Sequence, residues 1–283
     1  MTQVLTWNIQ NAKGVDGTIS LERIASVIKQ MGDPDVICLQ EISRHMPLKE
    51  GEVGPDQIAE ISELFPAHEV IFGPAVEGAC AGEGPRWQFG NATLSRLPVL
   101  SVFQHALPQP SEPGLRHMAR QAIELTVRAN QFPLRVVNTH LEFHSSSQRL
   151  AQVGRLRAIH SEITANNTHP PSFDAAGPYK ALHRPADCVL CGDFNMDVDS
   201  TEYTIMLNGV DETRLHDAWR RFHPGREHDP TCGIYDQQQW PQGAHCRDFF
   251  FVTETIAHQI AELSVNTATD ASDHQPLLLT LKR

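Results

Sequence analysis

The chain has 283 residues, of which 40% are hydrophobic and 20% are charged, a composition typical of a globular protein with a sizeable core. Its formal net charge of −11 argues against a broad basic groove for long nucleic-acid duplexes. An acidic site can still bind a small or terminal phosphate if it recruits a divalent cation. The N-terminus lacks the basic and apolar segments of a signal peptide, and no apolar stretch is long enough to span a membrane. We therefore expect a cytoplasmic protein without a membrane anchor.

The first residues predict a strand–helix–strand unit. Residues 4–9 indicate a strand that ends near Asn8. Ser20 is a suitable N-cap for the helix that follows, in which apolar residues recur at helical spacing. Residues 36–40 form a continuous apolar run of strand length, which ends at Glu41. If the two strands are parallel neighbours, Asn8 and Glu41 lie on one rim of the sheet.

The middle of the chain predicts further helices, strands and loops. A second helix begins at Pro55, and residues 147–164 form the clearest helix, with Leu150 among its inward residues. Gly, Ala and Pro residues predict irregular segments at 73–88 and 104–117. Strands are predicted at residues 69–72, 90–95, 120–127 and 134–140, the last two as a hairpin.

In the C-terminal half, residues 166–186 and 223–246 predict two long loops. Strands are predicted at residues 187–191, 248–252 and 277–281. We find no linker and no repeat, so we expect one catalytic domain over residues 1–283. Substrate recognition is expected in the segments with the weakest patterns, residues 73–88, 104–117, 166–186 and 223–246.

The sequence Gly192-Asp193-Phe194-Asn195 follows a buried-strand pattern. It delivers a carboxylate and a carboxamide from the end of a strand, where open α/β sheets place their chemistry. A hard cation or a phosphoryl group suits such donors. The alternative is an Asx turn, in which both side chains bond only nearby backbone.

Polar residues stand at several other predicted strand ends. They are Asn8, Glu41, His140, Asp193, Asn195 and the pair Asp273 and His274, while Asp248 opens a strand. A single residue of this kind is usually a turn former. Several of them on one rim, far apart in sequence, indicate a site.

The ordered motifs resemble the endonuclease/exonuclease/phosphatase superfamily of divalent-metal phosphohydrolases. They span residues 6 to 277, nearly the whole chain. Each motif is weak alone, but the ordered set is specific. The segments are Thr6-Trp7-Asn8, Leu39-Gln40-Glu41, residues 90–96, Asn138-Thr139-His140-Leu141, residues 192–195, residues 247–252 and residues 272–277.

The resemblance implies an α/β fold, a four-layer αββα sandwich of two mixed β-sheets packed face to face with helices outside. It also implies phosphoester hydrolysis with Mg²⁺ or Mn²⁺. Glu41 would be the principal metal ligand, with Asn8 and Asp273 as further ligands or partners of the ligands. Asp193 would orient or deprotonate the attacking water, with Asn195 beside it. His274, oriented by Asp248, would bind a phosphoryl oxygen, and His140 would contact the phosphate from the other side.

Elementary chemistry agrees with these roles. In-line displacement at phosphorus builds negative charge on oxygen, which a hard cation and a cationic imidazole stabilise. An aspartate partner fixes the tautomer and charge of such an imidazole. Which aspartate takes the proton of the water is not readable from the sequence.

Several residues keep alternative interpretations. Asn8 and Asn195 could be architectural, Arg120 could meet phosphate or form a surface ion pair, and His144 is expected to be an ordinary loop residue. Tyr235 and Trp240 could form an aromatic platform or simply anchor a loop. We expect the cysteines to be buried thiols, with a redox or zinc role for Cys188 and Cys191 as the alternative. The six cysteines of the chain are Cys38, Cys80, Cys188, Cys191, Cys232 and Cys246.

We therefore predict a metal-dependent phosphoric ester hydrolase that acts on a phosphodiester or phosphomonoester, in a small molecule or at a nucleic-acid end. The alternative is a DNA or RNA nuclease or repair phosphodiesterase, and the acidic charge balance disfavours it. A non-catalytic binding module with the same fold is a third hypothesis. The sequence indicates no obligate protein partner.

Overall fold

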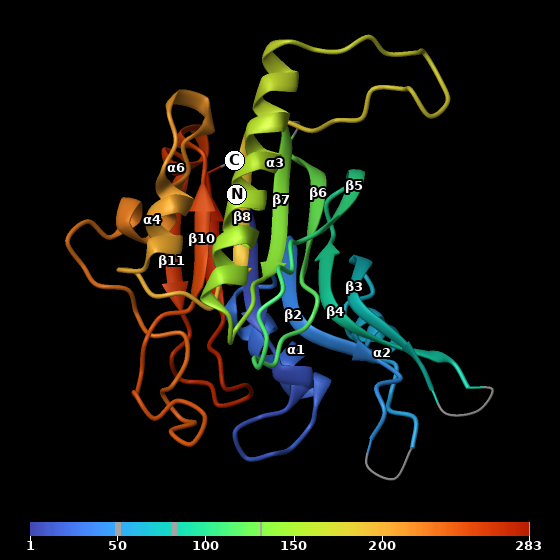
Figure 1. Ribbon diagram of the computed structural model, residues 1–283, viewed down its shortest axis with the longest axis vertical. Helices are drawn as coiled ribbons and strands as arrows, with labels where there is room; N and C mark the ends of the chain where they lie inside the picture. Colours follow the sequence, from blue (N-terminus) through green and yellow to red (C-terminus); the bar gives the residue numbers. More distant parts are fainter. Residues whose placement is uncertain (49–51, 81–83, 131, 283) are drawn as a thin grey trace.

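Two mixed β-sheets form the centre of the computed structural model, which describes residues 1–48, 52–80, 84–130 and 132–282 (Figure 1). The first sheet has the strand order β11 (Ile260–Val265), β12 (Leu277–Leu281), β1 (Thr2–Asn8), β2 (Val36–Arg44), β4 (Arg86–Ser95) and β3 (Glu69–Ala79). The second has the order β5 (Val99–Ala106), β6 (Gln121–Ala129), β7 (Phe132–His140), β8 (Cys188–Asp193), β10 (Asp248–Val252) and β9 (His216–Asp217). β1 is parallel to β2 and β7 is parallel to β8, whereas the other pairs are antiparallel.

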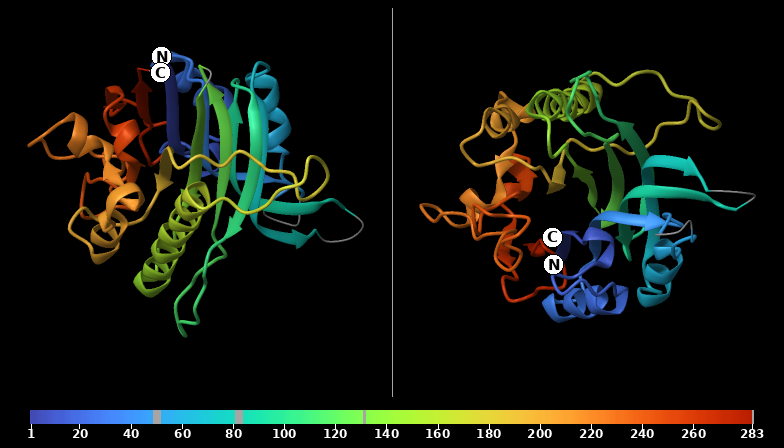
Figure 2. Two further views of the ribbon diagram at one scale, coloured as in Figure 1. Left: turned by 90° about the horizontal axis from the view of Figure 1, so that it is seen from above. Right: turned by 60° about the horizontal axis from the view of Figure 1, so that its bottom comes forward.

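Helices cover the outer faces of both sheets. α1 (Leu21–Met31) and α2 (Gln57–Leu64) lie on the first sheet, and α3 (Ser146–Thr168) and α4 (Thr201–Leu207) lie on the second. Figure 2 shows α3 and the two N-terminal helices on opposite sides of the strands. The shorter helices are α5 (Ala218–Phe222) and α6 (Glu254–Ala257), with 3₁₀ turns at Gln10–Ala12 and Asp211–Thr213. The predicted four-layer αββα sandwich is therefore confirmed.

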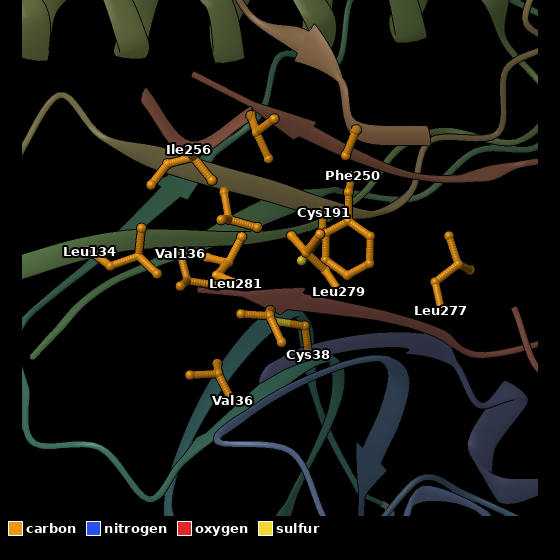
Figure 3. Packing of buried hydrophobic residues seen from close by; sticks show 14 of the residues in the cluster. Val36, Cys38, Leu134, Val136, Cys191, Phe250, Ile256, Leu277, Leu279 and Leu281 are labelled. Carbon is orange, nitrogen blue, oxygen red and sulfur yellow. The ribbon is translucent and has the colours of Figure 1, made fainter. Parts of the chain in front are cut away.

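Alternating side chains divide the apolar residues between the layers. In β1, Val4 faces the second sheet, whereas Leu5 and Trp7 pack with α1. Between the sheets, Cys38 of β2 lies in one cluster with Val136 of β7 (Figure 3). Burial of each large aliphatic side chain contributes about 1.5–3 kcal/mol, so this inter-sheet layer is a major source of stability.

A buried polar contact also joins the two sheets. Gln40 Nε2 of β2 donates to Asn138 Oδ1 of β7 at 2.8 Å. Asn138 Nδ2 lies 3.2 Å from the carbonyl oxygen of Leu39 and 3.0 Å from that of Ala92. The Asn138 carboxamide is therefore tied to two strands of the opposite sheet.

Several predicted elements agree closely with the structure. α1 begins at the expected N-cap, where Ser20 Oγ accepts the backbone N–H of Arg23 at 3.1 Å. β10 and β12 have the predicted bounds. The cysteines are free thiols, and Cys188 and Cys191 lie three residues apart in β8, where they belong to the core clusters on opposite faces of the second sheet. The prediction of buried thiols is confirmed for Cys38, Cys188, Cys191 and Cys232, whereas Cys80 and Cys246 are only partly buried. Burial raises the pKa of the Cys188 thiol to about 11.

Other predictions were wrong. Residues 73–88 were expected to be a loop, but β3 continues to Ala79 and β4 starts at Arg86; residues 81–83 lie outside the described part. β5 and β11 were not predicted as strands. Leu150 was expected to face inward, but it is 39% exposed because the buried face of α3 follows Val153 and Leu156 instead. Among the described residues, no helix is long and apolar enough to cross a membrane.

The long loop after α3 lies at the end of the sheets where β8 begins (Figure 1). Its His183 carbonyl oxygen accepts the hydroxyls of Ser101 and Thr126. β8 runs from this loop to Asp193 at the opposite end of the sheet.

Candidate active site

The predicted site residues meet at one end of both sheets. β1 of the first sheet ends there at Asn8 and β8 of the second sheet ends there at Asp193, while β7, which is parallel to β8, ends at His140 beside Asp193. Asp248 opens the antiparallel strand β10 directly opposite Asp193. A cleft of about 650 Å³ covers this end, and Glu41, His140, Asp193, Asn195 and His274 line it.

Glu41 does not follow the end of its strand as expected. β2 continues to Arg44, and Glu41 occupies a bulge between Leu39 and Ile42, where the pairing with β4 shifts. Its φ of 56° lies in the left-handed region, which costs a non-glycine residue about 1–3 kcal/mol. The bulge re-aims the side chain at this point, and the carboxylate reaches the cleft.

Asn8 connects the two halves of the site. Its Nδ2 lies 3.0 Å from Glu41 Oε1 in the first sheet and 2.9 Å from Asp193 Oδ2 in the second. Its Oδ1 accepts the backbone N–H of Gln10 at 3.1 Å. Asn8 therefore orients two carboxylates with its amide group.

The Asp193 segment combines a turn with a site. Asp193 Oδ1 accepts the backbone N–H of Asn195 at 2.9 Å, which is an Asx turn, while Oδ2 faces Asn8. Asn195 adopts a φ of 50°, a conformation that Asn tolerates. Gly192 has a φ of 139°, and a Cβ there would lie 1.8 Å from the Thr139 carbonyl oxygen. The Asx turn therefore uses one carboxylate oxygen, and the other oxygen bonds a side chain that is distant in sequence.

His274 is buried between carboxylates. Its Nδ1 lies 2.8 Å from Asp248 Oδ2, and its Nε2 lies 3.7 Å from Asp193 Oδ2. Burial alone would lower the pKa of His274, but Asp248, Asp193 and Asp273 outweigh it and hold that pKa well above its usual value. Trp7 Nε1 donates to the His274 carbonyl oxygen and fixes the backbone. His274 is thus set up as an oriented imidazolium.

His140 has the opposite electrostatic character. Burial, together with the nearby Arg120 and His274 cations, holds the pKa of His140 well below its usual value. Asn195 Nδ2 donates to His140 Nε2 at 3.1 Å and to the Leu141 carbonyl oxygen at 2.9 Å. The surroundings therefore favour the neutral form of His140 and the charged form of His274.

Trp240 anchors the long loop before β10 to the site. Its Nε1 lies 3.3 Å from Asp273 Oδ2, which also accepts Gln239 Nε2 at 2.9 Å. The Trp240 ring contacts His274 and Phe143 edge to face, with 5.6 Å between centroids in both pairs. Tyr235 does not line the cleft, because its hydroxyl bonds the Thr267 carbonyl oxygen. The anchoring interpretation thus holds for both residues, and Trp240 also contributes to the cleft wall.

The donor set fits a hard divalent cation at Glu41. Burial raises the pKa of Glu41, and the Asp273 carboxylate raises it further. A cation beside Glu41 would offset both effects. Asp193, Asp248 and His274 also place donor atoms within 4.8 Å of one another. Because Asp248 engages His274 Nδ1, only Nε2 of that ring is left for an ion or for a phosphoryl oxygen.

The sequence did not single out several residues of the cleft wall. Arg116, His117, Phe143 and His144 line it from two loops that lack periodic patterns. His144 is an exposed loop residue, as expected, and it also lines the cleft. Arg120 is buried and lies 3.3 Å from Glu142 Oε2, so it forms an ion pair and lines the cleft at once. Of the four segments expected to recognise substrate, 104–117 and 223–246 contribute to the cleft, whereas the described residues of 73–88 and 166–186 do not.

Solved structures show the same architecture. An endonuclease/exonuclease/phosphatase from Beutenbergia cavernae is 26% identical, with a TM-score of 0.69, over 98% of this chain and 70% of that one. A mannosyl-6-phosphatase from Bacteroides thetaiotaomicron is 18% identical, with a TM-score of 0.68, over 99% of both chains. A 3′ phosphatase from Neisseria, bound to a product DNA hairpin, is 18% identical, with a TM-score of 0.61, over 99% of both chains.

A comparison with curated proteins gave no match. The sequence itself matches the Endonuclease/Exonuclease/phosphatase family over residues 5–274. This range includes every predicted site residue. The chain belongs to the Endonuclease/Exonuclease/phosphatase family.

Proposed function

We propose that the protein hydrolyses a phosphoester of a small molecule or a nucleic-acid end, with Mg²⁺ or Mn²⁺, by in-line attack of an activated water. One observation carries the proposal. A continuous series of polar contacts links Glu41, Asn8, Asp193, His274 and Asp248 across both sheets, and three of these residues, Glu41, Asp193 and His274, line one cleft. Such a series provides a carboxylate for a cation, a carboxylate for a water and a cationic donor for phosphate.

Each residue has a proposed role that follows from its surroundings. Asp193 orients the attacking water and can accept its proton, because burial raises the pKa of this carboxyl group. His274 donates to a phosphoryl oxygen through Nε2 and stabilises the charge that develops there. Asp248 holds the His274 ring through Nδ1. Asn195 and the neutral His140 hold the phosphate or the water from the other side of the cleft.

Glu41 would hold the cation, with Asn8 and Asp273 beside it. When bound, Mg²⁺ or Mn²⁺ supplies Lewis-acid stabilisation of charge on the phosphoryl oxygens. Asn8 keeps the Glu41 carboxylate in one orientation through a 3.0 Å hydrogen bond. Asp273, which bonds Gln239 and Trp240, adds negative charge that favours a cation.

The size of the cleft supports a small or terminal substrate. Its volume of about 650 Å³ lies within the range typical of small-molecule sites, about 300–1,000 Å³. The net charge of −11 opposes tight binding along a polyanion. The mannosyl-6-phosphatase and the DNA-bound 3′ phosphatase among the similar structures are consistent with either a sugar phosphate or a nucleic-acid end.

A substrate panel tests the proposal. Purified protein is incubated with phosphomonoesters, phosphodiesters and nicked or 3′-phosphorylated DNA, in Mg²⁺, in Mn²⁺ and in a chelator. We expect metal-dependent release of product from a small or terminal substrate, and none from Asp193→Asn. Preferred turnover of internal DNA or RNA bonds would favour the nuclease alternative. If wild type binds a divalent cation but hydrolyses nothing in the panel, the non-catalytic module is favoured instead.

A further inference from the structure

We propose that Arg116 and His144 form a second anion-binding subsite in the cleft, which takes a second phosphate group of the substrate. This inference rests on the proposed phosphoester hydrolysis and specifies its substrate class. Both residues line the cleft but belong to different loops. Arg116 lies in the segment between β5 and β6, and His144 lies between β7 and α3.

The two side chains form one unit. Arg116 Nε lies 3.2 Å and Nη2 3.1 Å from His144 Nε2. Because a guanidinium only donates, His144 Nε2 is the acceptor and the ring carries its proton on Nδ1. The contact leaves Nη1 and one hydrogen of Nη2 for an anion, together with the His144 Nδ1–H. A planar guanidinium with adjacent free donors suits a phosphate.

The nearby carboxylates are already engaged. Glu142 accepts Arg120 Nε at 3.3 Å with one oxygen and the His144 backbone N–H at 2.9 Å with the other. Glu112 accepts the hydroxyls of Ser145 and Ser147 at the start of α3. Within the part of the chain that the structure describes, Arg116 forms no ion pair with a carboxylate. It is therefore an uncompensated cation in the wall of the cleft.

The Arg116–His144 pair is more exposed to solvent than the residues that would hold the reacting phosphate. Asp193 and His274 lie on the floor and are 1% and 3% exposed, whereas Arg116 and His144 are exposed. The side chain of Phe143, 41% exposed, also lines the cleft and offers apolar surface to the organic part of a substrate. A phosphate on the floor leaves Arg116 free for another anion of the same molecule.

Matched substrates test the subsite. For each pair, kcat/KM of the bisphosphate is divided by kcat/KM of the corresponding monophosphate. The first pair is glucose 1,6-bisphosphate and glucose 6-phosphate. The same ratio is measured for thymidine 3′,5′-bisphosphate against thymidine 5′-monophosphate. The two pairs distinguish a sugar source of the second phosphate from a nucleotide source. We expect wild type to prefer the bisphosphate of one pair.

The variant Arg116→Gln is expected to lower the ratio of kcat/KM for the bisphosphate to kcat/KM for the monophosphate about tenfold. A tenfold change corresponds to about 1.4 kcal/mol of lost binding. The control Arg128→Gln removes an exposed arginine at the far end of β6, where Arg128 pairs with Pro133, and should keep the wild-type ratio. Equal effects of Arg116→Gln on both members of a pair would overturn the proposal, as would a wild type without preference.

A binding measurement separates this inference from the proposed function. In the Asp193→Asn background, the Kd of each bisphosphate and monophosphate is determined by calorimetry with and without Arg116→Gln. If wild type hydrolyses nothing, the proposed function fails, but a bisphosphate preference in binding that depends on Arg116 still supports the subsite. A Kd that does not change in Arg116→Gln overturns the subsite even when wild type is an active hydrolase.

Discussion

His274 Nδ1 lies 2.8 Å from Asp248 Oδ2, and this contact joins the loop before β12 in the first sheet to the first residue of β10 in the second. Both residues are buried, at 3% and 1% exposure. The contact fixes the imidazole ring, so that its other nitrogen faces Asp193. The orientation of a proposed catalytic group thus depends on a partner in the opposite sheet.

Replacement of Asp248 by Asn should lower kcat about 10- to 100-fold, the usual cost of losing a partner that orients a catalytic or ligating histidine. Steady-state kinetics on the substrate found in the panel measure the effect, and circular dichroism checks the fold. Asp199→Asn, at an exposed position, serves as the control and should behave as wild type. A wild-type kcat in Asp248→Asn would contradict the proposed role.

Replacement of Glu41 by Gln should weaken divalent-cation binding by about tenfold or more, because the change removes the negative charge at an oxygen donor that Mg²⁺ and Mn²⁺ prefer. Calorimetric titration with Mn²⁺ measures this loss without substrate. Activity should return only at higher metal concentration and should vanish in a chelator. Glu60→Gln on the exposed face of α2 is the matched control. Unchanged Mn²⁺ affinity in Glu41→Gln would show that the cation binds elsewhere.

Replacement of Gly192 by Ala should destabilise the protein by at least about 2 kcal/mol, because the new Cβ would clash with the Thr139 carbonyl oxygen and the positive φ disfavours a side chain. Urea unfolding at neutral pH measures the change. Gly154→Ala in α3 is a control of opposite sign, since open space surrounds that position and alanine favours a helix by about 0.5–1 kcal/mol. Equal stability of both variants would contradict the clash.

We expect the stability of the protein to depend on pH through the buried carboxyl group of Glu124. Burial raises its pKa, but His105, Arg184 and Arg135 outweigh this and lower the pKa from 4.5 to about 2. Since the folded-state pKa is depressed, the ionised group stabilises the protein above the unfolded-state pKa. That contribution, on the order of 3 kcal/mol, is lost as the pH falls from 4.5 towards about 2.

The difference in the free energy of unfolding between wild type and Glu124→Gln isolates this group from other carboxylates. We expect the difference to be largest near neutral pH and to shrink below pH 4.5. Because Arg184 Nε bonds Glu124 at 2.7 Å, protonation should also loosen the loop after α3. A difference that does not vary with pH would rule out the proposed linkage.

Central elements could be predicted from the sequence better than edge elements. The strands β10 and β12 have inner positions and continuous apolar patterns, and their bounds match. The strands that were not predicted at all are β5, β9 and β11, which lie at sheet edges together with the shortened β3, whereas the inner strands β2 and β4 were shortened but not missed. Edge strands keep polar and exposed residues, and β3 contains Pro74 beside a bulge. Their local patterns therefore resemble loops.

The candidate site shows a similar division. Asn8, Asp193 and Asp248 were predictable because they stand where strands begin or end. Glu41 lies beside Asn8 as predicted, but its place in a bulge was not predictable, since a bulge inside a continuous strand leaves no periodic signal. Arg116 and His144 lie in loops, and only the fold brings them together.

The inter-sheet bonds of Asn138 and Gln40 have a consequence for how activity arises during folding. Because the first sheet and its loops supply Glu41 and His274 and the second supplies Asp193 and Asp248, neither sheet alone contains the complete proposed site. Recovery of turnover after dilution from denaturant should therefore coincide with docking of the two sheets, and not with the earlier appearance of secondary structure.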